Sequence, residues 1–207
     1  MKNIFLIFAI LSSSLSKAQH NYLTREDIKD AKQIIFFGYD FSHFKLADAK
    51  RINDKTITSF PPAWVGYLNK LKNEGYYADK LDTKKVIFHF SYAEIIIRNL
   101  KNEDIASLTK QPIPIDSIQP IINRYQTHFN EGIGFTIIVE YFDKMSNTSS
   151  AYFTFFDIAS KKIIMNRNYS TSNNTQGYGM TKYWGNSLSE TIFNYFERFY
   201  KKDLKAK

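Results

Sequence analysis

IGFTIIVEYF (Ile133–Phe142), AYFTFFDI (Ala151–Ile158) and KIIMNRNY (Lys162–Tyr169) are the three stretches that decide the fold. Each is rich in β-branched and aromatic residues, which favour the pleated, half-buried surface of a strand. The segments between them, Asp143–Ser150 and Asp157–Lys161, are short enough to be hairpin loops. Because hairpins join antiparallel strands, these residues predict a three-strand antiparallel meander at the C-terminal end of the sheet.

Two earlier segments also have the pattern of strands. In Ile34–Phe41 (IIFFGYDF), alternate residues fall on opposite faces of a strand. Residues 85–91 alternate in the same way around Val86, Phe88 and Phe90. The sequence therefore predicts about five strands.

Two amphipathic helices are predicted, over residues 61–74 and 181–202, because apolar residues recur there with helical spacing. The first begins at a pair of prolines, which a first turn tolerates, and Gly75 is expected to end it. A short helix is expected near residues 117–126. Residues 92–102 are compatible with either a strand or a helix.

Together these elements predict an α+β domain of two layers, a mainly antiparallel sheet covered by the helices. Trp64 and Trp184 lie on the apolar faces of the two long helices, so we expect both to be buried against the sheet. We expect one domain over residues 19–207, since the length of 207 residues suits a single domain and no long linker or repeat interrupts it.

The first residues have the pattern of a signal peptide, over residues 1–18. Lys2 precedes the unbroken apolar run IFLIFAIL (Ile4–Leu11), and small residues follow at Ser16 and Ala18. This predicts cleavage between Ala18 and Gln19. Eight apolar residues are too few to span a bilayer. We therefore expect a periplasmic or secreted protein with no transmembrane segment in the mature chain.

The composition excludes several classes of protein. The chain has no cysteine, which excludes a disulfide scaffold, a cysteine zinc site, an iron–sulfur cluster, a thiol nucleophile and a lipid-modified cysteine. The formal net charge is +8, but the lysines are spread along the chain in separate small groups. Export argues against a nucleic-acid partner, whereas attraction to an anionic surface remains compatible with this charge.

The order of elements over residues 33–200, together with a Phe-Asp-x-x-Ser-Lys-x-Ile turn at Phe156–Ile163, resembles small exported envelope proteins of Gram-negative bacteria. Some of these proteins serve as accessory factors or assembly lipoproteins, and many are uncharacterised. The resemblance implies a binding or accessory role toward another envelope component. This chain departs from the lipoprotein members because it lacks the cysteine that carries the lipid.

Asp40-x-x-His43, at the end of the first strand, is the best acid–base candidate, because a carboxylate can orient an imidazole. The alternative is a loop in which Asp40 accepts backbone N–H bonds, and we favour it because neither a G-x-S-x-G elbow nor an HExxH motif is present. A zinc site would have to assemble from scattered residues: His43, His89 and His128 with Asp40, Asp48 or Glu140. We therefore expect no metal and no cofactor.

The loop before the final helix is the best candidate for a ligand site. Gly177-Tyr178-Gly179 leads into the helix, and a glycine-rich entry can present free N–H groups to an anion. Tyr183 follows, and aromatic rings of this kind stack on sugars or peptides. A flexible turn that only feeds the helix is the structural alternative.

These observations favour an exported, non-catalytic envelope protein, a binding or accessory domain for another envelope component. The partner would be an envelope protein, a glycan or an anionic surface. One alternative is a small exported hydrolase that uses Asp40 and His43. Another is a glycan or polyanion binder that acts through the loop at residues 170–184. An enzyme should gather titratable groups in a concave pocket, whereas a binding module should expose an apolar or aromatic patch.

Overall fold

The computed structural model describes residues 23–47, 54–172 and 179–206, without the side chains of residues 54–56. The expected signal peptide and the cleavage site at Ala18 and Gln19 lie outside these residues. The described strands are β1 (Gln33–Asp40), β2 (Lys45–Ala47), β3 (Lys85–Phe88), β4 (Ala106–Ser107), β5 (Ile133–Asp143), β6 (Thr148–Asp157) and β7 (Ile163–Ser172).

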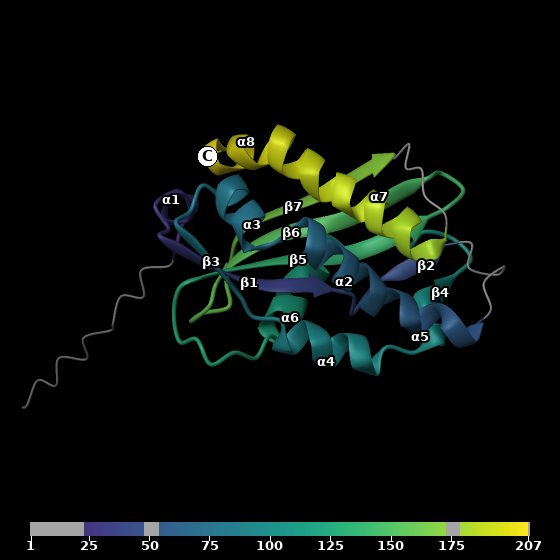
Figure 1. Ribbon diagram of the computed structural model, residues 1–207. Helices are drawn as coiled ribbons and strands as arrows, with labels where there is room; N and C mark the ends of the chain where they lie inside the picture. Colours follow the sequence, from purple (N-terminus) through teal and green to yellow (C-terminus); the bar gives the residue numbers. More distant parts are fainter. Residues whose placement is uncertain (1–22, 48–53, 173–178, 207) are drawn as a thin grey trace, which may run out of the picture.

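The helices alternate with these strands in the first part of the chain and close the fold at its end (Figure 1). They are α1 (Arg25–Lys29), α2 (Phe60–Leu71), α3 (Glu74–Leu81), α4 (Ser91–Asn99), α5 (Asn102–Ile105), α6 (Ile118–Asn123), α7 (Met180–Tyr195) and α8 (Lys201–Lys205). Short 3-10 turns precede α2 and α6, at Asp54–Ser59 and Ile115–Ser117, and a π-helical turn, Phe196–Tyr200, connects α7 to α8. The chain is thus an α+β protein.

The strands form one seven-stranded sheet, and the expectation of a mainly antiparallel sheet is wrong. Strand β1 pairs in parallel with β3 and β5, and β2 pairs in parallel with β4 and β5. Only β5 with β6 and β6 with β7 run antiparallel, over the segment that the sequence pattern singled out. Four of the six pairings are therefore parallel.

The parallel pairings follow from the connections that are not hairpins. Helices α2 and α3 lie between β1 and β3, and a crossover of this kind returns the chain to the same edge in the same direction. The eleven-residue strand β5 is long enough to pair with β1 along one half and with the short β2 along the other. The sequence analysis extended the hairpin pattern to the whole sheet and missed these crossovers.

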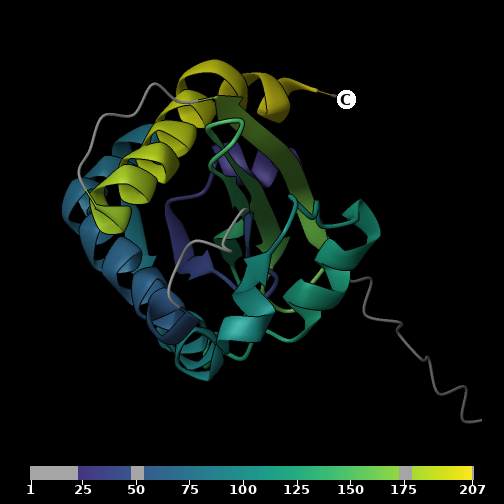
Figure 2. The same cartoon turned by 90° about the vertical axis from the view of Figure 1, so that its right-hand side faces the viewer.

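Both faces of the sheet are covered, so the two-layer expectation is also wrong. Strand β1 is buried at every residue after Gln33 because its side chains alternate between two hydrophobic clusters. Ile34 and Phe36 pack in the larger cluster, below α2, α3 and α7, whereas Ile35 and Phe37 pack in a smaller cluster around α6. Figure 2 shows α2 (blue) and α7 (yellow) together on one side of the sheet.

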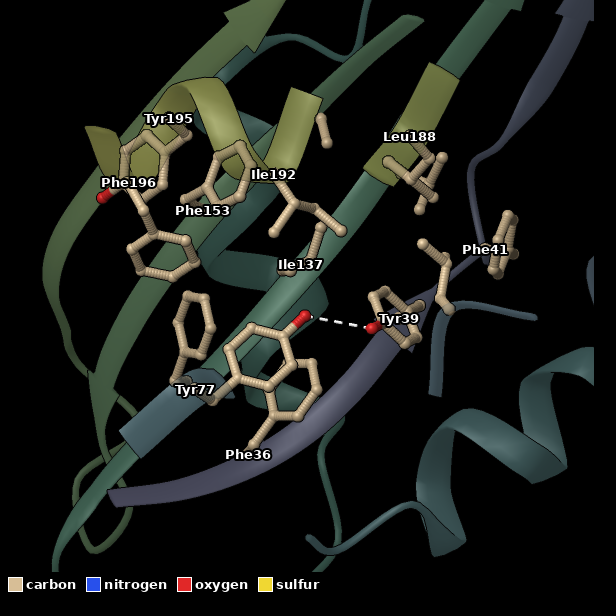
Figure 3. Packing of buried hydrophobic residues seen from close by; sticks show 14 of the residues in the cluster. Phe36, Tyr39, Phe41, Tyr77, Ile137, Phe153, Leu188, Ile192, Tyr195 and Phe196 are labelled. Carbon is tan, nitrogen blue, oxygen red and sulfur yellow. Dashed lines mark hydrogen bonds between the residues drawn. The ribbon is translucent and has the colours of Figure 1, made fainter. Parts of the chain in front are cut away.

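The larger cluster is strongly aromatic, and Figure 3 shows part of it. The hydroxyl groups of Tyr39 and Tyr77 share a hydrogen bond of 3.0 Å in its interior. Trp64 and Trp184 are fully buried in the same cluster, which confirms the expectation for both residues. Trp64 also donates its indole N–H to the carbonyl of Met180 at 3.1 Å, which ties α2 to the start of α7.

The helix boundaries differ from those expected. The predicted helix at 61–74 is α2, which ends at Leu71, and α3 begins immediately afterwards. Asn73 causes this break, because its side-chain oxygen accepts the N–H of Tyr76 at 3.0 Å and caps the new helix. Gly75 therefore lies inside α3, and the expectation that it ends the first long helix is wrong. The long helix expected at 181–202 is α7, the π-helical turn and α8 in succession.

The other helical expectations fall closer to the structure. The short helix expected near 117–126 is observed as a 3-10 turn followed by α6. The ambiguous segment 92–102 contains α4, which is a helix. Within the described residues, no helix is both long enough and apolar enough to cross a bilayer.

Two glycines allow helices to approach their neighbours closely. Gly38 has a φ of +90°, and a Cβ there would lie 2.9 Å from the ring of Phe90 and 3.5 Å from Ala93 of α4. Gly185 of α7 faces the ring of Tyr67 of α2, where a Cβ would lie 2.6 Å from the nearest ring carbon. These contacts hold α4 against β1 and α7 against α2.

Candidate functional site

A pocket of about 570 Å³ lies where the β5–β6 hairpin meets the start of α7. Its volume is within the range of small-molecule sites. The residues that line it come from the hairpin and from the first turns of the helix: Lys144, Asn147, Gly179, Met180, Tyr183 and Trp184. The pocket therefore joins two segments that are more than thirty residues apart in the sequence.

Helix α7 begins at this pocket, and its N-cap residue gives the first turn no side-chain cap. Gly179 occupies the N-cap position with φ of +80° and ψ of 154°, a conformation that glycine adopts without strain. It supplies no side chain, and no side-chain cap bonds the first turn. The first turn also contains no acidic residue. The partial positive charge of a sixteen-residue helix is thus directed at the pocket without an internal anion to neutralise it.

Trp184 forms one wall of the pocket and carries a donor that has no acceptor. Its ring is fully buried and stacks on Phe142, with 4.7 Å between centroids and 8° between planes. Its buried indole N–H finds no hydrogen-bond partner among the described residues. Most buried polar groups are paired in folded proteins, so an unpaired one beside a pocket is a reason to look for a ligand.

Tyr183 lies edge-on to Trp184, with 4.8 Å between the ring centroids. Its hydroxyl donates a hydrogen bond to the side-chain oxygen of Asn147 in the hairpin. Burial raises the pKa of this hydroxyl, so it stays protonated at neutral pH. The tyrosine therefore fixes the hairpin against the helix and gives the pocket a half-buried aromatic side.

Lys144 is the only charged residue among the described residues that line the pocket. The neighbouring Asp143 is turned into the hairpin, where its carboxylate accepts the N–H of Met145 at 3.0 Å and the hydroxyl of Ser146 at 2.5 Å. The pocket thus offers a cation, helix N–H groups and aromatic rings. This is a set of groups for binding an anion or an acidic sugar, and it contains no pair of nucleophile and base.

The predicted loop and the pocket overlap in part. Gly177 and Tyr178 lie outside the described residues. Gly179 and Tyr183, which the sequence analysis placed in the candidate ligand loop, line the pocket. Sequence reasoning missed Lys144 and Asn147. The hairpin was recognised as a turn, but nothing in its sequence says that it folds toward the start of the last helix. Asn147 has a left-handed φ of 55°, which is typical of a turn residue and does not indicate a ligand site.

The acid–base candidates Asp40 and His43 lie at the end of β1, away from this pocket. Asp40 is buried, and its carboxylate accepts the N–H of Ser42 and the hydroxyl of Tyr125, both at 2.7 Å. Tyr125 in turn contacts the hydroxyl of Thr136 at 3.0 Å. Asp40 thus accepts neutral donors in a structural network, and one of them is a backbone N–H.

His43 is half-buried beside this network. Burial lowers its pKa, the nearby charge of Asp40 opposes this in part, and the weaker effects of Arg124 and Lys45 lower the pKa further. The two residues are therefore close enough to interact electrostatically, but the hydrogen bonds of the carboxylate go elsewhere. Neither residue lines the pocket at α7.

The remaining candidates for a metal site do not converge within the described part of the chain. His89 and His128 contact each other, with 5.0 Å between ring centroids, but no group of three histidine, aspartate or glutamate side chains there is arranged to hold a metal. Asp48 lies outside the described residues. Glu140 is buried and accepts three bonds from Ile113, Ser150 and Asn168.

Comparisons with known proteins add little to this geometry. No family model matches the chain, and none of the curated proteins is significantly similar to it. Among solved structures the chain is similar to the lipoprotein GNA1162 from Neisseria meningitidis, with 10% identity and a TM-score of 0.30, over 82% of this chain and 99% of that one. This agrees only in part with the expected resemblance to envelope proteins, and at this score it carries no argument about function. The similar protein is a lipoprotein, which is contrary to the expected periplasmic or secreted state without a lipid anchor, and that expectation is corrected.

Proposed function

We propose that this chain is a non-catalytic binding protein of the bacterial cell envelope, and that the pocket at the start of α7 holds an anionic ligand, an acidic glycan by preference. The observation that carries the proposal is that one pocket is lined by Lys144, by the start of α7 and by Trp184, whose buried indole N–H has no hydrogen-bond partner among the described residues. The envelope part of the proposal rests on the export pattern of residues 1–18.

The three groups favour an anion for different physical reasons. The ammonium group of Lys144 attracts any anion, the helix N–H groups bind oxygen atoms at close range, and the indole N–H is a donor only. The aromatic side formed by Tyr183 and Trp184 favours a sugar ring over a bare ion, because a ring can pack against it. A neutral ligand would use only part of this set.

The test is a titration of the full chain with a sulfated tetrasaccharide at 0.15 M salt, in which binding is monitored by tryptophan fluorescence. Neutral maltotetraose is the control ligand. We expect the sulfated probe to bind and Lys144→Gln to weaken binding about three- to fivefold, as the loss of one partly exposed charge contact predicts. Lys110→Gln makes the same change of charge at an exposed residue outside the pocket and should leave the affinity unchanged.

Two results would overturn the proposal. If Lys144→Gln and Lys110→Gln weaken binding equally, the probe responds to the general positive charge and not to the pocket. If the neutral and the sulfated tetrasaccharides bind equally well, the pocket does not select an anion.

A further inference from the structure

A second pocket lies between α2 and α4, separate from the pocket at α7. It is an open groove of about 510 Å³, lined on the α2 side by Val65, Gly66 and Asn69 and on the α4 side by Glu94 and Ile97. In Figure 1, α4 runs below α2 and beside β1. A narrower space of about 60 Å³ continues from the groove toward the core. The groove therefore has an open part and a deep part.

The walls of this groove are mainly apolar. Val65 of α2 and Ile97 of α4 line both parts of it, and the deep part is bounded by Tyr39, Phe90 and Ala93. Gly66 leaves room at the surface of α2, since a Cβ placed there would meet no atom within 4 Å. The groove thus offers apolar surface and free volume to a chain of methylene groups.

The polar residues at the point where the groove deepens are Asn69 and Glu94. The side-chain oxygen of Asn69 is buried and has no hydrogen-bond partner among the described residues. Asn69 and Glu94 line both the open and the deep part, from opposite helices. Arg98, at the outer part of the groove, donates its Nε–H to the carbonyl of Glu94 in its own helix at 3.3 Å. The groove therefore offers an unpaired hydrogen-bond acceptor at Asn69.

We propose that this groove binds a small single-chain amphiphile, a medium-length alkyl chain that ends in a hydroxyl group. The alkyl chain would lie along Val65 and Ile97, and the hydroxyl would donate its hydrogen bond to the side-chain oxygen of Asn69. A carboxylate at the deep end fits poorly because it has no proton to donate to Asn69 at neutral pH and would lie beside Glu94, whereas Arg98 lines only the open part. The proposal is independent of the anion site at α7.

The test is an NMR titration of the full chain with 1-octanol and, separately, with octanoate. We expect 1-octanol to shift the amide signals of Val65, Asn69 and Ile97, and octanoate to bind at least about tenfold more weakly, as the loss of one buried hydrogen bond and the approach of two anions predict. Asn69→Leu keeps the size of the side chain and should remove most of the preference for the alcohol.

Gly66 provides a blocking variant and a matched control. Gly66→Phe places a ring in the open volume of the groove and should abolish 1-octanol binding, while the fold is retained because glycine is the poorer helix former. Gly66→Ala adds only a methyl group and should bind 1-octanol like the wild type. Neither variant should alter binding of the sulfated tetrasaccharide at α7. Equal affinity for octanoate and 1-octanol, or undiminished binding by a folded Gly66→Phe protein, would overturn the proposal.

Discussion

Substitution of Gly38 by alanine should strongly destabilise the protein, because two independent costs meet at this residue. Its φ of +90° is a conformation that a side chain disfavours, at a cost of about 1–3 kcal/mol. The added Cβ would also lie 2.9 Å from the ring of Phe90, and overpacking of this kind costs about 1–3 kcal/mol. Since the Phe90 ring can shift in part, we expect a total loss of about 2–4 kcal/mol in the free energy of unfolding.

The measurement is urea denaturation of the wild type, Gly38→Ala and Gly66→Ala. Gly66 is the matched control, because the same methyl group meets no atom within 4 Å in the middle of α2. Gly66→Ala should therefore raise the stability by about 0.4–1 kcal/mol. A loss of stability in Gly38→Ala together with a gain in Gly66→Ala would support the close contact of α4 with β1 at Gly38.

A double variant separates the two costs at Gly38. In a Phe90→Ala background the clash is absent, so Gly38→Ala should cost only the backbone part of its effect, and the two substitutions should couple by about 1 kcal/mol or more. The reasoning is refuted if Gly38→Ala lies within about 0.5 kcal/mol of the wild type. Strictly additive effects of the two substitutions would show that the ring of Phe90 does not limit the space at Gly38.

The remaining predictions concern the core, the histidines and one ion pair. Trp184→Ala should lower the free energy of unfolding by about 3–5 kcal/mol, because a fully buried ring is removed, and a loss below about 1 kcal/mol in urea would mean that the ring is not packed. Burial lowers the pKa of His43 and of His89 below the ordinary value of 6.5, so the unfolded chain takes up protons first as the pH falls. Stability should therefore decrease below about pH 6.5 and level off below the folded pKa values, and a double His→Gln variant that shows the same decrease would contradict this. Arg167→Gln should cost about 1–3 kcal/mol at pH 7, because it leaves the buried carboxylate of Asp203 without its charged partner, and thermal melting at pH 7 that shows no loss would refute it.

The local elements of the fold could be predicted from the sequence, but the way they assemble could not. Alternation of apolar residues located β1, β3 and the strands of the C-terminal segment, and helical spacing identified Trp64 and Trp184 as buried. The direction of pairing depends on contacts between segments far apart in the chain. The crossovers through α2 and α3 made β1 and β3 parallel, and no short pattern in the sequence reports that.

The candidate site was predictable only on its helical side. Gly179 and Tyr183 are signalled by the glycine-rich entry to a helix, a local pattern with a known physical cause. Lys144 and Asn147 belong to the pocket because the β5–β6 hairpin reaches the start of α7, a consequence of the length and pairing of those strands. The groove between α2 and α4 likewise depends on the packing of α4 against β1 at Gly38.

The most direct test of the proposed function is an NMR titration of the isotope-labelled full chain with the sulfated tetrasaccharide. The account predicts that the backbone amides of Met180, Thr181 and Lys182 and the indole N–H of Trp184 shift together and saturate with one affinity, since the three amides belong to the first turn of α7 and Met180 and Trp184 line the pocket there. Shifts confined to lysines elsewhere on the surface, with the amides of α7 and the Trp184 indole unmoved at saturation, would contradict it.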